Sequence, residues 1–384
     1  MRGLAFLTTL LGLTSAAFLT PRTTTACNNS PQLCSRSYSE ITHLGAHDSP
    51  FVRDATTADS TSGNQNYNST VQLAAGVRML TAQVHNSNGE WHLCHTSCNL
   101  LDAGLLSDWL SEIKSWMNSN PNEVVTILLV NSDGASPSDL ATQFSTSGII
   151  KYVYTPPSIT STPTTWPTLQ TLISDGTRLL TFVASLDAST LDSTNSYLMN
   201  EFTFIFENPY EVLSFSDFSC TADRPSSVQG NTKTALAANM MPLMNHFLDS
   251  DIGFGIDIPD VDNITVTNAP GTSTGMLGAS AQNCKAVYDK APTFILVDFF
   301  DQGPAIATVD SLNGVTNPVG RTPVSSASSA GASTSRTAIS FAGVVALVKE
   351  VKSGARPALG AWIWAAGDWS YGGVNLSGGK AIQK

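Results

Sequence analysis

The stretch His43-Leu44-Gly45-Ala46-His47-Asp48-Ser49 and the later stretch Cys94-His95-Thr96-Ser97-Cys98 decide the fold that this sequence predicts. The first follows the short run Ser39-Glu40-Ile41-Thr42, and the second follows two segments that resemble strands. Two imidazoles at the ends of neighbouring strands can supply a general base and a general acid to one substrate. Phosphodiester cleavage by an internal hydroxyl needs such a pair, because one proton must leave and another must arrive.

Apolar segments recur along the chain and alternate with helix-like segments. Residues 124–131 form a nearly unbroken run of β-branched and leucine side chains, which is typical of a strand buried on both faces. Residues 105–117 carry apolar side chains at helical spacing. Further strands are expected at residues 76–85, 91–95, 179–185, 202–206, 254–258 and 294–300. Strands that alternate with helices predict a parallel α/β sheet, and seven or eight of them favour a closed TIM-type β/α barrel.

The composition changes near Pro318, so we expect one barrel domain over residues 27–320 and a Ser/Ala-rich flexible tail over residues 321–384. An apolar run at residues 341–348 resembles part of a lipid-anchor signal, but basic residues follow it where such a signal ends apolar. Two interpretations of the tail therefore stay open. It is either a genuine extension, with or without cell-surface anchoring, or an aberrant C-terminus.

The N-terminus has the pattern of an export signal, with Arg2, an apolar run too short to span a bilayer, and small residues before position 17. We expect residues 1–17 to be removed and the mature protein to be extracellular. Six cysteines, an even number, then predict up to three disulfides. Proximity along the chain favours the following pairs, although other pairings stay open: Cys27–Cys34, Cys94–Cys98 and Cys220–Cys284.

The charge pattern excludes one class of partner. The net charge is −11 and only 13% of the residues are charged. No basic stripe exists to neutralise phosphates, so nucleic acid is not an expected partner. Strong electrostatic adhesion to anionic membranes is not expected either. We expect a monomer with sequons for N-glycosylation at Asn28, Asn68, Asn263 and Asn375.

The string at residues 45–49 resembles the first catalytic motif of the phosphatidylinositol-specific phospholipase C X-domain family. In that motif a strand is followed by Gly, a small residue, His, Asp or Asn, and Ser. Residues 76–80 resemble the second barrel strand of the family, and His95 falls where its second histidine is expected. The similarity runs from about Ile41 to Asp310. It is greatest to secreted fungal phospholipase C-like phosphodiesterases, in which strings like residues 82–86, 91–98 and 296–300 recur.

This resemblance implies three catalytic roles. His47 would be the general base that takes the proton from the inositol hydroxyl next to the phosphate. His95 would be the general acid that protonates the leaving alcohol. Asp298 would orient an imidazole and stabilise its cationic form, as a buried carboxylate can.

One position departs from the family pattern. The metal-independent bacterial enzymes carry an acidic residue and an arginine on the second strand, whereas this chain has Thr81-Ala82-Gln83. Gln83 can donate hydrogen bonds but carries no charge for the phosphorane. Alternation along the strand places His85 on the same face as Gln83, so a protonated His85 could partly replace the cation. The alternative is a surface histidine beside the following turn.

The remaining strand-end residues are expected to contact the substrate. Asp48 and Glu207 would offer oxygen ligands to Ca²⁺ or Mg²⁺ if the fold brought them together, and otherwise no metal or cofactor is expected. His246 is expected to be a core histidine rather than a pocket residue. The expected substrate-binding residues are Asp48, Gln83, His85, Asn131 and Glu207.

Three functions compete. The leading hypothesis is a secreted phosphodiesterase that cleaves a phosphoinositide, a glycosylated inositol phospholipid or a soluble glycerophosphodiester, with transient contact to a membrane surface. The second is a catalytically silent barrel relative that binds phosphorylated head groups or acts as a cell-surface protein, and Gln83 favours it. The third is a metal-dependent phosphodiesterase of the glycerophosphodiester or sphingomyelinase D kind. It needs a carboxylate pair that Thr81 and Gln83 do not provide.

Overall fold

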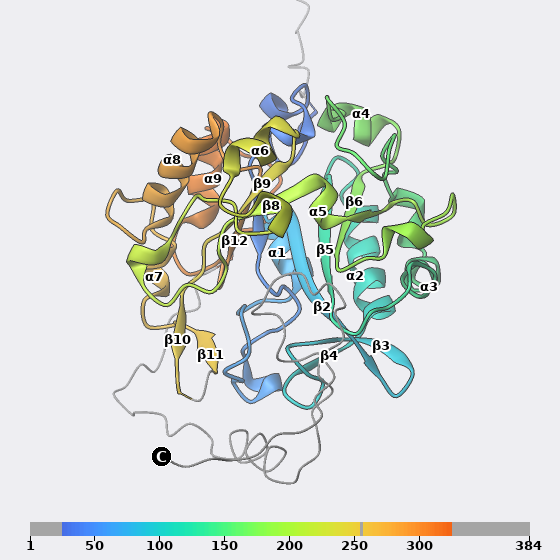
Figure 1. Ribbon diagram of the computed structural model, residues 1–384, viewed down its shortest axis with the longest axis horizontal. Coiled ribbons are helices and arrows are strands. Elements are labelled where there is room, and N and C mark those ends of the chain that lie inside the picture. The colour runs from blue at the N-terminus through green and yellow to red at the C-terminus, as the bar shows by residue number, and fades with distance from the viewer. Residues whose placement is uncertain (1–24, 254–255, 325–384) are drawn as a thin grey trace, which may run out of the picture.

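The computed structural model of the protein describes residues 25–253 and 256–324 (Figure 1). The expected export signal, residues 325–384 of the tail and the sequon at Asn375 lie outside the described residues. The centre of the described chain is a curled parallel sheet with the strand order β7-β6-β5-β2-β1-β12-β9-β8. Its strands are β1 (His43–Ala46), β2 (Met79–Ser87), β5 (Val125–Asn131), β6 (Leu179–Ala184), β7 (Leu198–Asn200), β8 (Ile205–Glu207), β9 (Met241–Asn245) and β12 (Phe294–Val297).

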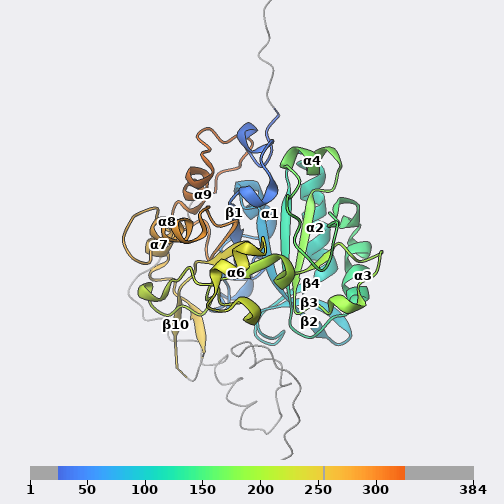
Figure 2. The same ribbon diagram turned by 45° about the horizontal axis from the view of Figure 1, so that its top comes forward.

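Helices cover the outside of this sheet, so the predicted α/β barrel type of fold is confirmed. Figures 1 and 2 show α2, α3 and α4 on one side and α8 and α9 on the other. The edge strands β7 and β8 are joined by the short helix α5 and are not hydrogen-bonded neighbours in the described sheet, so the barrel is open there. The helices are α1 (Ser69–Ala75), α2 (Leu106–Ser119), α3 (Pro137–Ser147), α4 (Leu169–Ser174), α5 (Glu201–Phe204), α6 (Thr232–Ala237), α7 (Ile264–Thr267), α8 (Leu277–Tyr288) and α9 (Ala305–Asn313).

The most regular sequence patterns formed the expected elements. Every residue of β5 except Val130 is buried, because this strand is covered on both faces. Helix α2 buries one apolar stripe that includes Trp109 and Ile113 and leaves its polar face to solvent.

Two of the expected strands were wrong. Residues 202–206 are divided between α5 and the three-residue strand β8. Residues 254 and 255 lie outside the described residues, and Asp257 and Ile258 belong not to the barrel but to a small antiparallel hairpin of β10 (Asp249–Asp251) and β11 (Asp257–Pro259). The barrel strand of this region is β9, which sequence patterning missed because its apolar run is short and contains Pro242. Pro242 has no N–H to donate, yet its carbonyl accepts a hydrogen bond from the Thr293 N–H at 3.0 Å.

Beyond the barrel, β2 continues into an antiparallel ribbon. It pairs with β3 (Glu90–Cys94), which pairs in turn with β4 (Asp102–Leu105). Figure 1 shows this ribbon and the β10–β11 hairpin at the same end of the molecule. Both project from the end of the barrel at which the parallel strands finish, and they wall the space between them.

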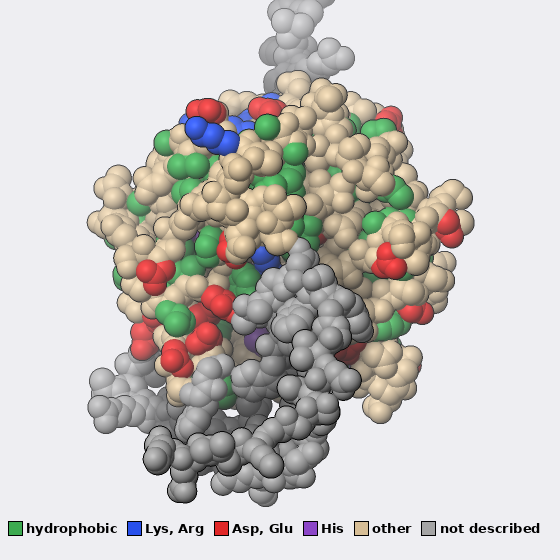
Figure 3. All heavy atoms as spheres, viewed as in Figure 1, with side chains coloured by type: hydrophobic (Ala, Val, Ile, Leu, Met, Phe, Trp, Pro, Cys, Tyr) green, Lys and Arg blue, Asp and Glu red, His purple; other side chains and the backbone are tan. Residues whose placement is uncertain are grey.

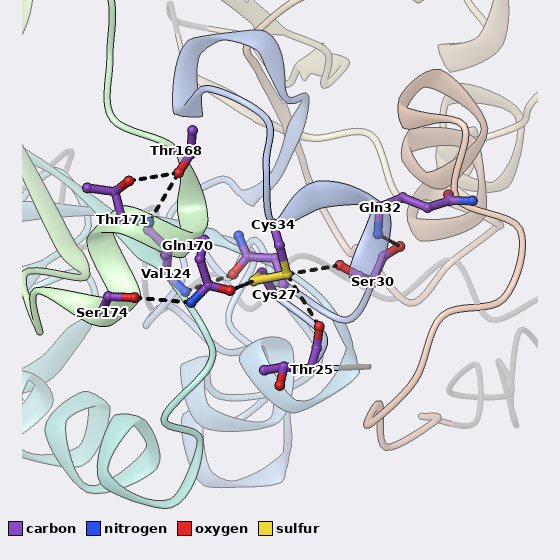
Figure 4. The surroundings of a disulfide bond; sticks show 11 residues. Thr25, Cys27, Ser30, Gln32, Cys34, Val124, Thr168, Gln170, Thr171 and Ser174 are labelled. Atoms are coloured by element: carbon purple, nitrogen blue, oxygen red, sulfur yellow. Dashed lines mark hydrogen bonds between the residues drawn. A yellow bond between two sulfur atoms is a disulfide. The ribbon is translucent and has the colours of Figure 1, made fainter. Parts of the chain in front are cut away.

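The three disulfides of the structure are the pairs that sequence proximity favoured. Their Cα–Cα distances are 5.0 Å for Cys27–Cys34, 4.7 Å for Cys94–Cys98 and 5.0 Å for Cys220–Cys284. Figure 4 shows the first of them beside Gln170 of α4, so this bridge closes a loop of the N-terminal segment that contacts α4. No helix in the described part of the chain is long and apolar enough to cross a membrane.

One predicted glycosylation site is wrong for the folded chain. Asn28 is 5% exposed, its side-chain oxygen accepts a hydrogen bond from the backbone N–H of Val124 at 2.7 Å, and its Nδ2 atom is buried. A glycan attached to that nitrogen would have no path to solvent. Asn68 and Asn263 immediately precede α1 and α7, and their glycosylation stays a prediction.

Candidate active site

A cavity of about 270 Å³ opens at the C-terminal ends of the barrel strands. Its wall is formed by residues from the strand ends, from the loop after β8, and from the β2–β3 ribbon and the β10–β11 hairpin. Figure 3 shows acidic side chains gathered on the molecular face near this hairpin. The polar and aromatic residues that line the cavity include His47, Asp48, Asn64, Gln83, His85, His95, Glu201, Glu207, Tyr210, Glu211, Arg224, Asn245, Phe247, Asp249 and Asp257.

His47 stands directly after β1 and is held on three sides. Its Nδ1 lies 2.9 Å from Oδ1 of Asp298, which follows the neighbouring strand β12. The side-chain amide of Asn64 donates to the same carboxylate oxygen at 3.1 Å. The ring of Phe247 stacks on the imidazole with centroids 3.9 Å apart and planes 3° from parallel. These contacts fix the ring and leave Nε2 as the atom available to a substrate.

The charges around His47 determine its protonation. Burial lowers the pKa of His47, but the carboxylates of Asp48 and Asp298, with a smaller effect from Asp249, raise it to about 9. The imidazole is therefore cationic at neutral pH in the free protein. Burial, together with the negative charge of Asp298, raises the pKa of Asp249 to about 7. The cavity thus holds a carboxyl group that titrates near neutrality beside a basic imidazole.

His95 follows β3 in a short loop that the Cys94–Cys98 disulfide closes. Its backbone N–H donates to the carbonyl of Leu101 at 2.9 Å, and the ring of Phe51 meets the imidazole edge-on at 5.3 Å. Burial lowers the pKa of His95, and the opposing effect of the Asp48 carboxylate is smaller. His95 is therefore neutral under conditions in which His47 is charged.

The two histidines meet at one carboxylate oxygen. Oδ2 of Asp48 lies 3.8 Å from Nε2 of His47 and 3.5 Å from Nε2 of His95. The two nitrogen atoms are therefore no farther apart than the sum of these distances. The structure thus brings together the two imidazoles that sequence analysis placed in one site.

Gln83 connects the loops that carry these histidines. Its Nε2 donates to Oδ2 of Asp48 at 2.7 Å, and its Oε1 accepts the backbone N–H of Thr96 at 2.8 Å. The backbone N–H of Asp48 also donates to the hydroxyl of Thr81 at 2.8 Å. Gln83 lines the cavity, but both ends of its amide have partners within the protein, so its binding of substrate stays a prediction.

Glu207 forms the centre of a second polar cluster in the cavity wall. It forms an ion pair with Arg224, whose Nε donates to Oε2 at 3.1 Å, and the side-chain amide of Asn245 donates to the same oxygen at 3.1 Å. The guanidinium lies 4.2 Å from the centroid of the Tyr210 ring. Sequence analysis missed Arg224 because it lies in a long loop without a motif. Its backbone pairing with Glu207 is created by the fold and leaves no signal in the sequence.

Glu201 adds a second acidic group to the cluster around Glu207. Glu201 is 1% exposed, and its Oε1 has no hydrogen-bond partner among the described residues. Burial and the neighbouring Glu207 raise the pKa of Glu201 well above its ordinary value. Burial also opposes ionisation of Glu207, but Arg224 outweighs it and lowers the pKa of Glu207. The cluster is thus a neutral carboxyl next to a paired carboxylate.

Three further residues considered in the sequence analysis lie in different surroundings. His85 lines the cavity with its Nδ1 3.3 Å from Oδ1 of Asp133. Asn131 does not line the cavity, and its side-chain amide exchanges hydrogen bonds of 2.9 and 2.7 Å with the backbone of Ala135, so its binding of substrate stays a prediction. His246 is fully buried, as expected for a core histidine, and its Nε2 lies 2.9 Å from the carbonyl of Thr267.

Asp48 and Glu207 both line the cavity, but among the described residues neither belongs to a group of three or more side chains with metal-site spacing. Asp48 is hydrogen-bonded to Gln83, and Glu207 pairs with Arg224. Within residues 25–253 and 256–324, one group of His, Cys, Asp and Glu side chains has metal-site spacing, namely Cys94, Cys98 and Asp102. Both sulfur atoms of that group are already joined in the disulfide.

The fold and the site together define a parallel β/α-barrel protein with paired, carboxylate-supported histidines at the carboxyl ends of its strands. A family model described as "PI-PLC X 1" matches residues 33–313. The chain therefore belongs to the PI-PLC X family.

Two relatives from one fungus and one solved structure are similar to this chain. The chain is 36% identical to "PI-PLC X domain-containing protein 1" of Arthroderma benhamiae over 291 residues, which cover 75% of this chain and 90% of the relative. It is 35% identical to an "Uncharacterized secreted protein" of the same fungus over 77% of this chain and 66% of the relative. A solved structure of phosphatidylinositol-specific phospholipase C from Listeria monocytogenes is 16% identical, with a TM-score of 0.49, over 74% of this chain and 95% of that one.

Proposed function

We propose that the protein cleaves an inositol phospholipid or a related phosphodiester by general acid–base catalysis, with His47 as base and His95 as acid. One observation carries this proposal. The Nε2 atoms of the two imidazoles both lie within 4 Å of a single carboxylate oxygen, Oδ2 of Asp48, at 3.8 and 3.5 Å, and both residues line the same cavity. A phosphodiester group bound there can reach both nitrogen atoms, as a concerted transfer of two protons requires.

The reaction follows from this placement. His47 removes the proton from the inositol hydroxyl, whose oxygen attacks phosphorus, while His95 protonates the departing alcohol oxygen. The products are a cyclic inositol phosphodiester and the lipid alcohol, with one proton removed and one returned. Hydrolysis of the cyclic product would reverse the two roles, since water then supplies the nucleophile. Asp298 keeps the proton of His47 on Nδ1, so that Nε2 is the basic atom.

The protonation states restrict which molecules are active at a given moment. The productive form has a neutral His47 and a charged His95, whereas the pKa shifts favour the opposite distribution. Only a minor fraction of the free protein is then competent near neutral pH. That fraction contains a strong base and a strong acid, because a high pKa makes His47 a better proton acceptor and a low pKa makes His95 a better donor. The rate should therefore show a bell-shaped dependence on pH.

The polar cluster around Glu207 suits recognition of a polyol head group. Carboxylate oxygens accept hydrogen bonds from hydroxyl groups, and the guanidinium of Arg224 donates to them. The ring of Tyr210 offers a flat face beside the guanidinium. Among the described residues that line the cavity, Arg224 is the sole Lys or Arg side chain, and it is paired with Glu207.

A binding role without catalysis is the second candidate, and the charge balance of the cavity favours it. Acidic residues of the cavity wall outnumber the cationic ones, and Gln83 contributes no charge. A phosphorane intermediate would then receive less electrostatic stabilisation than a site rich in cations provides. The acidic residues concerned are Asp48, Glu201, Glu207, Glu211, Asp249 and Asp257.

We also propose that the protein acts outside the cell. Three disulfides in a chain of this size fit an oxidising compartment, and one relative is named a secreted protein. The substrate would then be presented by an outer membrane surface or be dissolved in the medium.

The deciding experiment incubates the purified chain with phosphatidylinositol vesicles, with and without EDTA, and follows cyclic inositol phosphate by phosphorus NMR. We expect product in both conditions and a loss of about 10²–10⁴-fold in each of His47→Asn and His95→Asn. His92→Asn is the matched control, because His92 pairs with Asp102 on the ribbon outside the cavity wall. Product formation that survives either active-site substitution would refute the catalytic assignment. Binding of vesicles without any product would support the second candidate.

A further inference from the structure

The Gln83 side chain joins two backbone positions that have the same unusual conformation. Asp48 directly follows His47 and has φ of 46°, and Thr96 directly follows His95 and has φ of 61°. Both values lie in the left-handed region, which non-glycine residues seldom adopt and which persists where the surroundings hold it. One amide, 2.7 Å from the Asp48 carboxylate and 2.8 Å from the Thr96 N–H, contacts both.

The chemistry of these two contacts requires an amide. Asp48 presents a carboxylate oxygen that needs a donor, and Thr96 presents an N–H that needs an acceptor. Glutamate at position 83 would accept from Thr96 but would repel Asp48. Arginine would donate to Asp48 but has no atom that can accept from Thr96. Methionine has a similar length and makes neither contact, whereas asparagine is one methylene shorter.

We infer that Gln83 is a positioning residue that fixes the spacing between the general base and the general acid. This inference rests on the proposed function and deepens it. Gln83 acts through its neighbours: it holds the Asp48 carboxylate between the two Nε2 atoms and holds the loop of His95 at the edge of the cavity. The neutral residue at this strand position is therefore a different solution to the assembly of the site rather than a defect in phosphate binding.

The other contacts of the His95 loop explain why the two hydrogen bonds of Gln83 matter. The disulfide between Cys94 and Cys98 closes the loop on itself, and the Leu101 carbonyl anchors its base. Neither contact reaches across the cavity to the loop of His47. Gln83 makes this connection from β2, which lies beside β1 in the sheet. Removal of the amide should therefore displace His95 from the leaving group more than it displaces His47 from the attacking hydroxyl.

The activity test compares two inositol phosphodiesters that differ only in the leaving group. One releases an alkyl alcohol, which needs a proton from His95, and the other releases nitrophenolate, which does not. In Gln83→Met we expect kcat for the alkyl ester to fall about 100-fold and kcat for the nitrophenyl ester to fall by less than about tenfold, with little change in KM. Gln83→Arg should show the same selective loss, because it cannot accept from Thr96.

A matched control separates positioning from general damage to the fold. Gln72 is a fully buried glutamine, and its side-chain Nε2 donates to the backbone carbonyl of Ser49 at 2.9 Å without lining the cavity. Gln72→Met should change the rates with both esters by the same factor. Equal losses in Gln83→Met, a loss confined to KM, or a gain of activity in Gln83→Arg would overturn the inference, because each indicates a phosphate-binding or purely structural role.

A second readout does not depend on turnover. Hydrogen exchange of the Thr96 backbone amide should be about tenfold faster in Gln83→Met than in the wild-type chain and should stay slow in Gln83→Glu, which keeps the acceptor. Unchanged exchange in Gln83→Met would overturn the inference. A wild-type chain that cleaves neither ester would refute the proposed function, and the exchange measurement would still decide whether Gln83 ties the two loops.

Discussion

Replacement of Asp298 by Asn gives the most direct test of the site. The carboxylate of Asp298 is 1% exposed and lies 2.9 Å from Nδ1 of His47. The substitution keeps the size of the side chain and removes its charge. It therefore asks whether the pairing of imidazole and carboxylate, rather than the shape of the cavity, gives His47 its basicity.

The expected magnitude follows from the pKa of His47. Its rise from 6.5 to about 9 corresponds to about 3 kcal/mol in favour of the charged ring. Asp298 is the contributor that forms a direct hydrogen bond, and Asp48 lies farther away at 3.8 Å. Burial lowers the pKa of His47, and the Asp298 carboxylate offsets much of that effect. Asp298→Asn removes this offset and should lower the pKa of His47 by about 2. A lower pKa increases the neutral fraction of His47, but without the Asp298 carboxylate the Nδ1 proton and the ring orientation are no longer fixed, so kcat should fall by about 10³-fold, with KM nearly unchanged.

The assay combines two measurements on the same protein. Imidazole chemical shifts, followed by NMR from pH 5 to pH 10, report the pKa of His47, and cleavage of an inositol phosphodiester reports kcat. Asp301→Asn is the matched control, because Asp301 lies in the same loop, bonds to Asn66 at 3.1 Å and does not line the cavity. A His47 pKa that stays near 9 in Asp298→Asn, or a kcat within about fivefold of the wild-type value, would refute the assigned role of this pair.

Three further predictions concern separate groups. His95→Gln should lower kcat for an alkyl ester by about 10²-fold or more and leave a nitrophenyl ester nearly unaffected, so equal losses on the two esters would contradict its role as acid. Asp249 has a folded-state pKa of about 7, above its ordinary 3.8, so the wild-type chain should lose stability as pH rises between these values. Asp249→Asn should therefore be more stable than wild type by about 4 kcal/mol at pH 8 in urea unfolding, and a difference that is constant from pH 4 to pH 8 would be inconsistent with this. Arg78→Met should destabilise the fold by about 3–5 kcal/mol, because it leaves the buried partner Glu123 unpaired, while kcat of the folded variant stays unchanged; a loss below 1 kcal/mol would argue against the buried pair.

Local sequence patterns were enough to predict the elements that depend on local chemistry. The unbroken apolar run of β5 identified a strand buried on both faces, and the apolar spacing of α2 identified its inner stripe. Short separations favoured the Cys27–Cys34 and Cys94–Cys98 disulfides, because neighbouring cysteines need little loop closure. Short strands were the weak point, since β8 and β9 have too few residues to show a period.

The candidate site also has a part that the sequence predicted and a part that it did not. The positions of His47 and Asp298 could be predicted because each follows a parallel strand, and the carboxyl ends of parallel strands meet at one end of a barrel. His95 follows β3 of the antiparallel ribbon, so its place in the site was indicated by the family motif and not by the parallel sheet. The sequence by itself therefore determined which strand ends carry the acid–base groups. The use of Gln83 and Arg224 could not be predicted this way, because hydrogen-bond partners depend on side-chain direction and on loops distant in sequence.

Only the tertiary structure decided how these groups are connected. It directed both ends of the Gln83 amide to protein partners, set the Asp48 oxygen between two imidazoles, and brought Arg224 from a long loop to Glu207. It also turned Asn131 away from the cavity towards the backbone of Ala135. The physical reason is that strand periodicity specifies the face on which a side chain lies, whereas contacts between chain segments far apart in sequence specify its partners.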